Sequence, residues 1–420
     1  MYGSNKRTKI RIDKMKKKAT KSKNVPKNTE EKIPKTQKSA KKTSIQPAKI
    51  KVIGIGGGGG NAISRMMESP ERVRGVEFIA VNTDAQDLDF VSAHRKVYIG
   101  KALTRGLGAG MNPEIGKQAA EENRSEIGEL IDGADIVFVT AGFGGGTGTG
   151  AAPIVAEVAK EKGILTIGII TKPFMFEGSQ RTQIAQEGIA KLKDKVDALV
   201  IIPNDRIFSL IDKETSVVRA FGFIDEVLKN AVQSLAELIN TPGLINVDFA
   251  DVKATLKDAG TTLIGIGIGS GQERAVKAIQ SALNSPLLEI SIDGARSVLF
   301  SIAGGKDIKM AEVHEIASAV SNGLDANARV IFGSYYDRSL KDKSIKVTVI
   351  ATGFNGVFSQ RMITPTLFMT EEIPKVSHHE AQKTEETREK SKVSEEKQKT
   401  QEVQEEEAWE IPAFLRKKKK

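Results

Sequence analysis

Two glycine-rich segments constrain the fold of this chain more than any other feature. Residues 56–60 follow the apolar run 51–55, and residues 144–150 follow the apolar run 135–140. A helical pattern comes after each segment. Glycine lets backbone N–H groups approach a bound anion closely, and a helix N-terminus favours negative charge. Two strand–glycine–helix units therefore predict that phosphate groups bind at one edge of a sheet.

The remaining pattern predicts an α/β fold. Further apolar runs read as strands, and helical segments alternate with them, which is typical of a parallel sheet covered on both faces. These strands are 76–81, 164–170 and 198–202, and these helices are 114–132, 152–162 and 179–193. A long helix over 217–239 follows and stops at Asn240-Thr241-Pro242-Gly243.

The pattern after the long helix changes to a smaller α+β domain. Its strands are predicted at 261–269, 295–303, 329–335 and 344–352, and its helices at 272–283 and 307–321. The expected organisation is a nucleotide-binding domain over 50–215, a central helix over 216–240, and the second domain over 241–369.

Charge divides the chain unevenly. The first 48 residues contain 16 Lys and Arg against 3 Asp and Glu, whereas the other 372 contain 47 against 50. We expect residues 1–49 to form a disordered basic arm, because so few apolar residues cannot offset chain entropy. The arm either contacts nucleic acid or anionic lipid, or is a solvated extension without a specific partner.

A second compositional change lies near the C-terminus. Residues 371–407 hold 12 Glu and 7 Lys and Arg without an aromatic residue, so 370–407 is predicted to be a charged linker. Residues 408–420 then carry an apolar cluster, which is either a frayed end or a peptide that docks on a partner. Its predicted docking residues are Trp409, Ile411, Pro412, Phe414, Leu415 and Arg416.

Composition excludes several classes of site. The chain has no Cys, which excludes disulfides, zinc–thiolate sites, iron–sulfur clusters and a cysteine nucleophile, and its four His leave little for a histidine-built metal site. No metal site made by the protein alone is predicted. No apolar run approaches the length of a spanning helix and no signal peptide opens the chain, so a cytoplasmic location is expected.

The first glycine segment taken alone has a second interpretation. Gly54, Gly56 and Gly59 match the dinucleotide fingerprint, and Asp84 ends the next strand, which would fit an NAD-dependent oxidoreductase. The second glycine segment favours a nucleoside triphosphate instead. Such a ligand carries roughly four negative charges and two helix N-termini offer about +0.5 each, so Mg²⁺ would supply much of the remainder.

Taken together, the motifs resemble those of FtsZ, the bacterial relative of tubulin. The second loop reads GGGTGTG, the signature of that family, and other matching segments are spread over residues 50–369. They are Asn82-Thr83-Asp84-Ala85-Gln86, Gly106 to Glu114, Thr171 to Gly178 with Arg181, Ile202-Pro203-Asn204-Asp205, and Asn246 to Val252. The C-terminal Ile411 to Arg416 also resembles the family's terminal peptide, whereas the basic arm and the four final lysines depart from the pattern.

The resemblance implies a tubulin/FtsZ-like GTPase that binds GTP and GDP with Mg²⁺ and polymerises head to tail into the filaments of the midcell division ring. It also implies a set of nucleotide-binding residues. These are Gly57, Gly58, Gly59, Gly60, Asn61, Asn82, Asp84, Gly108, Ala109, Gly110, Gly145, Gly146, Thr147, Gly148, Thr149, Glu177, Arg181, Asn204 and Asp225. Asn204 and Asp225 would read the guanine edge, because a carboxylate accepts from both N–H groups there and adenine lacks that donor pair.

The resemblance further implies that Asp248 and Asp251 act catalytically in the nucleotide pocket of the next subunit. The residues alone favour a different interpretation, in which Asp248 is a helix cap and Asp251 a first-turn acid stabilised by the helix dipole. The C-terminal peptide would dock on membrane-tethering partners such as FtsA, so that membrane contact is indirect, and the four final lysines would add attraction to anionic lipid. A non-hydrolysing structural filament protein of the same fold is the main alternative.

Overall fold

The computed structural model describes residues 47–69, 75–212, 214–241, 243–285, 291–337, 340–341 and 343–354. The basic arm up to residue 46, the charged linker and the C-terminal peptide lie outside these ranges, as does the predicted end of the second domain, 355–369. Across the described ranges, no helix is both long enough and apolar enough to cross a membrane.

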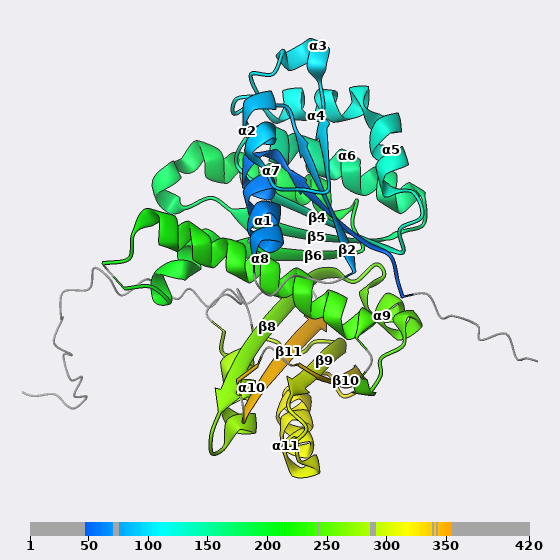
Figure 1. Cartoon of the computed structure of the whole chain (residues 1–420), viewed down its shortest axis with the longest axis vertical. Helices are drawn as coiled ribbons and strands as arrows, with labels where there is room; N and C mark the ends of the chain where they lie inside the picture. Colours follow the sequence, from blue (N-terminus) through cyan, green and yellow to red (C-terminus); the bar gives the residue numbers. More distant parts are fainter. Residues whose placement is uncertain are drawn as a thin grey trace, which may run out of the picture. The chain divides into compact units, whose positions relative to one another are not determined.

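Six parallel strands form the first half of the sheet, in the order β3-β2-β1-β4-β5-β6 (Figure 1). They are β1 (Ile50–Ile55), β2 (Val76–Asn82), β3 (Arg95–Tyr98), β4 (Ile136–Gly142), β5 (Leu165–Lys172) and β6 (Ala198–Pro203). β1 pairs with both β2 and β4, so that Ile50 lies opposite Val76 and Ile136. The predicted parallel sheet is confirmed, and both glycine segments leave from the carboxyl ends of adjacent strands.

Helices cover both faces of this half-sheet. One face packs against α1 (Gly56–Glu68), α2 (Ala85–Phe90) and α8 (Val217–Asn240). The other packs against α4 (Pro113–Glu122), α5 (Arg124–Ile131), α6 (Thr147–Glu161) and α7 (Ser179–Lys193). Along β1 the side chains alternate, with Val52 on the α1 side and Ile53 on the α6 side. Shorter helices are α3 (Lys101–Thr104), η1 (Met175–Glu177) and η2 (Asn204–Ser209).

Two predicted helices differ most from the structure. The segment predicted as one helix over 114–132 is two helices, because Asn123 bonds outside the helical ladder: its Oδ1 accepts from Gly100 N at 2.9 Å and its Nδ2 donates to Glu126 Oε2 at 2.8 Å. α6 begins at Thr147, five residues before its predicted start. Its first turns are glycine-rich since α4 packs closely on it, and a Cβ at Gly150 would collide with the Pro113 carbonyl.

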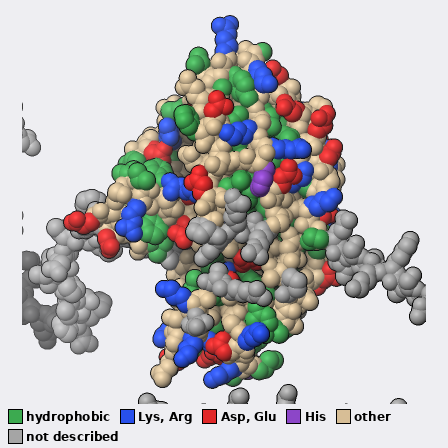
Figure 2. Space-filling model, viewed as in Figure 1, with side chains coloured by type: hydrophobic (Ala, Val, Ile, Leu, Met, Phe, Trp, Pro, Cys, Tyr) green, Lys and Arg blue, Asp and Glu red, His purple; other side chains and the backbone are tan. Residues whose placement is uncertain are grey.

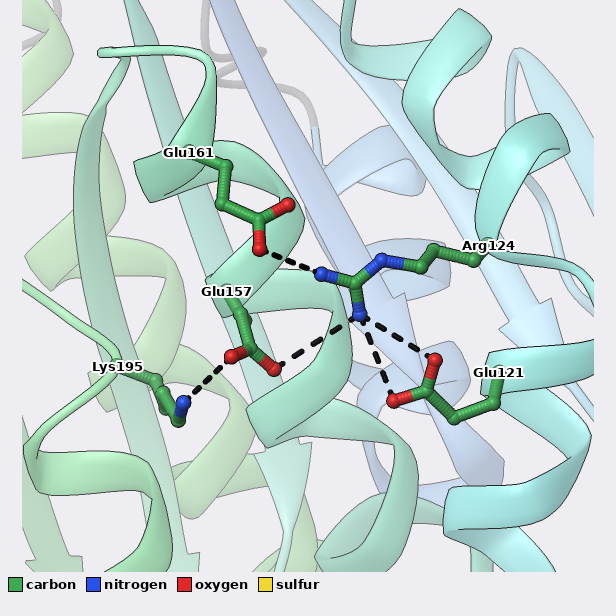
Figure 3. Close-up of polar contacts among 5 residues, drawn as sticks. All are labelled: Glu121, Arg124, Glu157, Glu161 and Lys195. Atoms are coloured by element: carbon green, nitrogen blue, oxygen red, sulfur yellow. Dashed lines mark hydrogen bonds and ion pairs between the residues drawn. The ribbon is translucent and has the colours of Figure 1, made fainter.

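A cluster of five charged side chains joins the helices on the α6 side (Figure 3). Arg124 pairs with Glu161 at 2.7 Å, Glu121 at 3.3 Å and Glu157 at 3.8 Å, and Lys195 pairs with Glu157 at 2.5 Å. The hydrogen bond from Lys195 holds the pKa of Glu157 below its usual value. All five side chains are partly exposed, so each pair contributes at most about 1 kcal/mol, and the apolar core dominates stability here.

The second half of the sheet continues the first in the order β8-β11-β9-β10-β7. Its strands are β7 (Gly243–Ile245), β8 (Gly260–Ser270), β9 (Ser297–Gly304), β10 (Arg329–Tyr336) and β11 (Ser344–Thr352). β11 is antiparallel to β8 and β9, whereas β9 and β10 are parallel. One face packs against α10 (Arg274–Leu283) and α11 (Met310–Ser321), and the other against α8 and α9 (Phe249–Leu256). This mixed arrangement confirms the predicted α+β character.

Two connections join the halves. The predicted one is α8, whose Glu237 accepts from the Tyr335 hydroxyl at 2.8 Å and from Lys346 Nζ at 3.1 Å. The second was not predicted: β6 pairs with β8 through Ala198 opposite Gly260 and Leu199 opposite Thr261. α8 is therefore fixed on the second half near its C-terminal end, while its earlier turns pack on α1 and η2.

Candidate functional site

The two predicted phosphate loops touch each other. A Cβ built on Gly56 would lie 3.0 Å from the Gly148 backbone nitrogen, and one built on Gly58 would lie 3.3 Å from the Gly142 backbone. Gly56 also has φ of +69°, a left-handed conformation that glycine adopts without strain. The first turns of α1 and α6 contain no acidic residue. The partial positive charge of their unpaired N–H groups is therefore not neutralised by a carboxylate of the same turn. This arrangement suits an anion that spans both helix ends.

A third loop, residues 108–112, closes over the second. Gly146 N donates to the Gly110 carbonyl at 3.0 Å, and the Thr149 hydroxyl accepts from Gly144 N at 3.0 Å. The predicted residues Ala109 and Gly110 thus pack directly on the GGGTGTG segment, whereas Gly108 N donates to the Thr83 carbonyl at 3.2 Å. The structure brings the three predicted loops together at the carboxyl end of the sheet.

Gly146→Ala is expected to weaken nucleotide binding by about tenfold or more, because positional errors of an ångström at a hydrogen-bonded site cost this much. The added methyl would lie 2.5 Å from the Gly110 carbonyl oxygen, and backbone on both sides must move to relieve that contact. Gly128→Ala is the matched control, since Gly128 lies within α5, outside the predicted site, and a Cβ there would come no closer than 3.4 Å to another side chain. Equal affinity of both variants for GDP, measured by calorimetry, would contradict this role for the loop contact.

Asn82 and Asp84 shape the loop after β2. The Asn82 side chain accepts from Thr83 N at 2.8 Å and donates to Asp87 at 2.7 Å, and Asp84 caps α2 by accepting from Gln86 N at 3.0 Å. The Thr83 hydroxyl lies 2.6 Å from that of Thr147, which ties this loop to the GGGTGTG segment. These two predicted site residues therefore frame the phosphate loops through their side-chain bonds.

The residues predicted to contact the sugar and base lie on η1, α7, η2 and α8. Glu177 Oε2 pairs with Arg181 at 2.6 Å, and its Oε1 accepts from Phe174 N at 3.0 Å. Asn204 begins η2, is buried, and has a side-chain oxygen without a hydrogen-bond partner among the residues that the structure describes. A buried unpaired acceptor costs about 1–3 kcal/mol. A ligand N–H group placed against Asn204 would remove that cost.

Asp225 lies on α8, and its side chain is 12% exposed. Burial raises the pKa of this carboxyl to about 6, although the positive charge of Arg65 acts in the opposite direction. Arg65 Nε is 2.6 Å from Asp225 Oδ2. This arginine comes from the last turn of α1, 160 positions before its partner, and sequence analysis did not identify it.

An aromatic group beside these residues was also missed. Phe174 stacks on Phe176 with ring centroids 4.8 Å apart and meets Phe221 edge-on at 5.4 Å. Phe221 precedes Asp225 by one helical turn, so both lie on the same side of α8. The spacing of four residues between Phe221 and Asp225 was the sequence signal that could have identified this aromatic residue as part of the site. Phe221 is 41% exposed, so part of its surface is available to a ligand.

Apolar side chains are exposed around this end of the molecule. Figure 2 shows hydrophobic side chains at the left of the view, over the region where α8 begins in Figure 1. We call the exposed apolar residues of η1, η2 and the start of α8 the apolar rim. It consists of Met175, Phe176, Phe208, Leu210, Val217, Val218 and Phe221. An exposed apolar group of this size marks an interaction surface.

Asp248 and Asp251 lie at the N-terminal end of α9. Asp248 is the N-cap and its side chain accepts from Ala250 N at 3.5 Å, while Asp251 is in the first turn. Both side chains are exposed, whereas Val252 and Leu256 on the same helix are buried. The capping interpretation and an outward-facing pair of carboxylates therefore describe the same geometry.

The predicted carboxylates and base-contacting residues are separated by most of α8. Fifteen residues lead from Asp225 to Asn240 at the end of that helix, a distance of about 22 Å at 1.5 Å per residue. Asp248 follows after β7. The structure thus places the phosphate loops with the base-contacting residues, and places Asp248 and Asp251 at the other end of the helix.

No group of three or more His, Cys, Asp and Glu that could hold a metal ion occurs among the described residues. The six predicted docking residues, Trp409 to Arg416, lie outside the described ranges.

Comparison with known proteins identifies two family domains. Residues 49–212 match the GTPase domain of the tubulin/FtsZ family, and residues 260–355 match the C-terminal domain of the FtsZ family. An FtsZ dimer from M. jannaschii is 44% identical, with a TM-score of 0.70 over 79% of this chain and 96% of that one. A tryptophan-to-tyrosine mutant of M. jannaschii FtsZ is 47% identical, with a TM-score of 0.69 over 73% and 92%. CetZ1 from Haloferax volcanii, a GDP-bound monomer, shares the fold at 24% identity and a TM-score of 0.65, over 74% and 95%.

Proposed function

Because the chain belongs to the FtsZ family of tubulin-like proteins with a GTPase domain, we propose that it hydrolyses GTP at the interface between subunits of a head-to-tail filament. The observation that carries this proposal is the separation of Asp248 and Asp251 from the phosphate loops along α8. The loops themselves contain no Asp, Glu or His to orient an attacking water. A neighbouring subunit supplies the carboxylates.

The nucleotide lies across three groups of residues in this proposal. Its phosphates lie against residues 57–61 and 145–149, at the N-terminal ends of α1 and α6, and Mg²⁺ neutralises the charge that the helix ends leave. Glu177 and Arg181 lie beside the ribose and phosphates. Asn204 and Asp225 read the guanine edge, and the half-exposed ring of Phe221 stacks on the base.

Assembly follows from the positions of the two surfaces. The nucleotide and the apolar rim lie near the first turns of α8, and the carboxylates follow its last turn, so one subunit's end meets the opposite end of the next. Such a contact is heterologous, because two different surfaces meet. Since its repetition does not close into a ring, it generates filaments. The FtsZ dimer among the similar structures supports self-association.

In the cell, these filaments form the division ring at midcell, in the cytoplasm. The peptide at 408–416 docks on a membrane-tethering division protein such as FtsA, and the linker at 370–407 gives it reach. These roles follow from the family and from the composition of the terminal segments.

Specific GTPase activity is expected to rise with protein concentration. A site shared between subunits exists only in the filament, so phosphate release per molecule should be lowest in dilute solution and level off above the concentration at which light scattering increases. The measurement is phosphate release across a dilution series with GTP and Mg²⁺. Constant activity per molecule would show that each subunit is complete by itself, and filaments without phosphate release would favour a non-hydrolysing structural protein.

A further inference from the structure

We infer that Arg65 is a specificity-determining residue of the guanine site: by pairing with Asp225 it keeps that carboxylate charged and in position to accept from the base. The inference rests on the proposed function, since it assumes that Asp225 reads guanine. It goes beyond that function by assigning a role to a residue on α1 that need not touch the nucleotide.

The contact is short and selective. Arg65 Nε lies 2.6 Å from Asp225 Oδ2, and the arginine side chain is 44% exposed while the aspartate is 12% exposed. A charge-assisted hydrogen bond of this length is among the stronger side-chain contacts. The guanidinium also lies against the backbone of α8, because a Cβ added at Gly222 would be 3.1 Å from Arg65 Nη1. Glycine at 222 therefore makes room for Arg65 one turn before Asp225.

The chemistry requires the ionised form. The guanine edge offers two N–H donors, and only a carboxylate can accept from both. A protonated carboxyl would present its own O–H to one of them. Burial favours that neutral form, and the adjacent positive charge of Arg65 opposes it, so that the pKa of Asp225 is held at about 6.

Several other charged side chains on the elements that pack against this part of α8 have different contacts. On α1, Glu68 accepts from the Ser92 hydroxyl at 3.1 Å. On η2, Asp205 accepts from Met175 N at 3.0 Å, and Arg206 is the other charged residue of that element. On α8 itself, Lys229 donates to the Ser69 hydroxyl at 3.3 Å, and Glu226 and Arg219 complete the charged residues of these turns. Arg65 is the charged side chain paired with Asp225.

The direction of the pH effect follows. Binding requires ionised Asp225. The affinity for GDP is therefore at its maximum above the pKa of Asp225 and falls about tenfold for each pH unit below that pKa. Removing Arg65 removes the interaction that lowers this pKa, and the fall must begin at higher pH. At pH 7 the wild type keeps most of its affinity, whereas Arg65→Met should bind GDP roughly two- to a hundredfold more weakly, because an adjacent opposite charge lowers a carboxyl pKa by about 1–3 units, and its affinity should recover toward pH 8.5.

The experiment measures GDP affinity from pH 5.5 to 8.5 for the wild type, Arg65→Met, Arg65→Lys and Arg95→Met. Arg95→Met is the matched control, because it removes a partly exposed arginine whose carboxylate partner is Glu77, on β2. Phosphate groups of GDP titrate alike with every protein, so the ratio of affinities to wild type isolates Asp225. We expect the affinity of Arg65→Met relative to wild type to decrease as the pH is lowered. The same ratio should stay constant for Arg95→Met, and Arg65→Lys should restore the wild-type profile. A flat ratio for Arg65→Met would overturn the inference.

A second measurement is independent of nucleotide binding. The ¹³C carboxyl resonance of Asp225, assigned by its loss in Asp225→Asn, is titrated in the nucleotide-free wild type and Arg65 variants. A midpoint at higher pH in Arg65→Met supports the inference, and an unchanged midpoint overturns it. Failure of the wild type to bind GDP at any pH would instead reject the proposed function, and the titration would still decide the role of Arg65.

Discussion

Replacing both Asp248 and Asp251 by asparagine is expected to reduce GTP hydrolysis by about 10²–10⁴-fold while leaving GTP affinity unchanged, the usual range for loss of a general base. Asparagine is as good an N-cap as aspartate, so Asp248→Asn keeps the start of α9 while removing its charge. Alanine at 248 would remove the cap as well, at a cost of about 0.5–2 kcal/mol. The asparagine pair therefore separates catalysis from helix stability.

Asp258→Asn is the matched control. Asp258 follows the C-terminal end of α9, is exposed, and pairs with Lys160 at 3.1 Å. Its replacement removes an acid close to the same helix without touching the proposed catalytic end. Phosphate release under assembly conditions and GTP affinity by equilibrium dialysis are measured for both variants. Near-normal hydrolysis by the double variant would exclude these carboxylates as the catalytic groups.

Mixing provides a direct test of the shared site. The double variant has an intact pocket, and a pocket variant such as Asp225→Leu has intact carboxylates, so neither should hydrolyse GTP alone. In a 1:1 mixture with random head-to-tail contacts, about a quarter of the interfaces join an intact pocket to intact carboxylates. We therefore expect phosphate release to reappear at roughly that fraction of the wild-type rate, provided that both variants co-sediment in the same filaments. Co-sedimentation without activity would argue against a shared site.

The glycine loops and the long helix could be predicted because their signals are local. A strand, a glycine segment and a helix adjoin one another in sequence, and the stop at the end of α8 is carried by four consecutive residues. The predicted start of α6 was late since glycine is a poor helix former in isolation. Close packing by α4, which leaves no space for a Cβ at Gly150, overrides that preference.

Features set by distant contacts could not be predicted. The break at Asn123 depends on the backbone N–H of Gly100, and the pairing of β6 with β8 joins residues about 60 positions apart. Arg65 and Asp225 meet only because α1 and α8 pack on the same face of the sheet. No spacing rule connects such residues. For Asp248, sequence offered capping and catalysis as alternatives, whereas the exposed position of this cap is compatible with both roles at once.

Asp225→Asn is expected to change base preference from guanine to xanthine. In the proposed site the carboxylate accepts from the N1–H and the 2-amino group of guanine, but a carboxamide presents one acceptor and one donor. Its N–H would face the guanine amino group without a bond. Sites built around such hydrogen bonds reject a mismatched edge by large factors, so GTP affinity should fall by about 10²-fold or more. Xanthine carries a 2-oxo group that accepts from the carboxamide, and XTP should therefore bind more tightly than GTP.

The control for this change is Asp194→Asn, which removes an exposed carboxylate at the C-terminal end of α7. It should keep the wild-type preference for GTP. Competition between GTP and XTP for each protein gives the preference as a ratio, so a general loss of stability cannot imitate a reversal. A reversal of the preference also requires a folded pocket. Filament assembly of Asp225→Asn with XTP would show that recognition of the base at residue 225 controls assembly. If Asp225→Asn still prefers GTP over XTP, then Asp225 does not contact the 2-position of the base, and Asn204 must carry the discrimination.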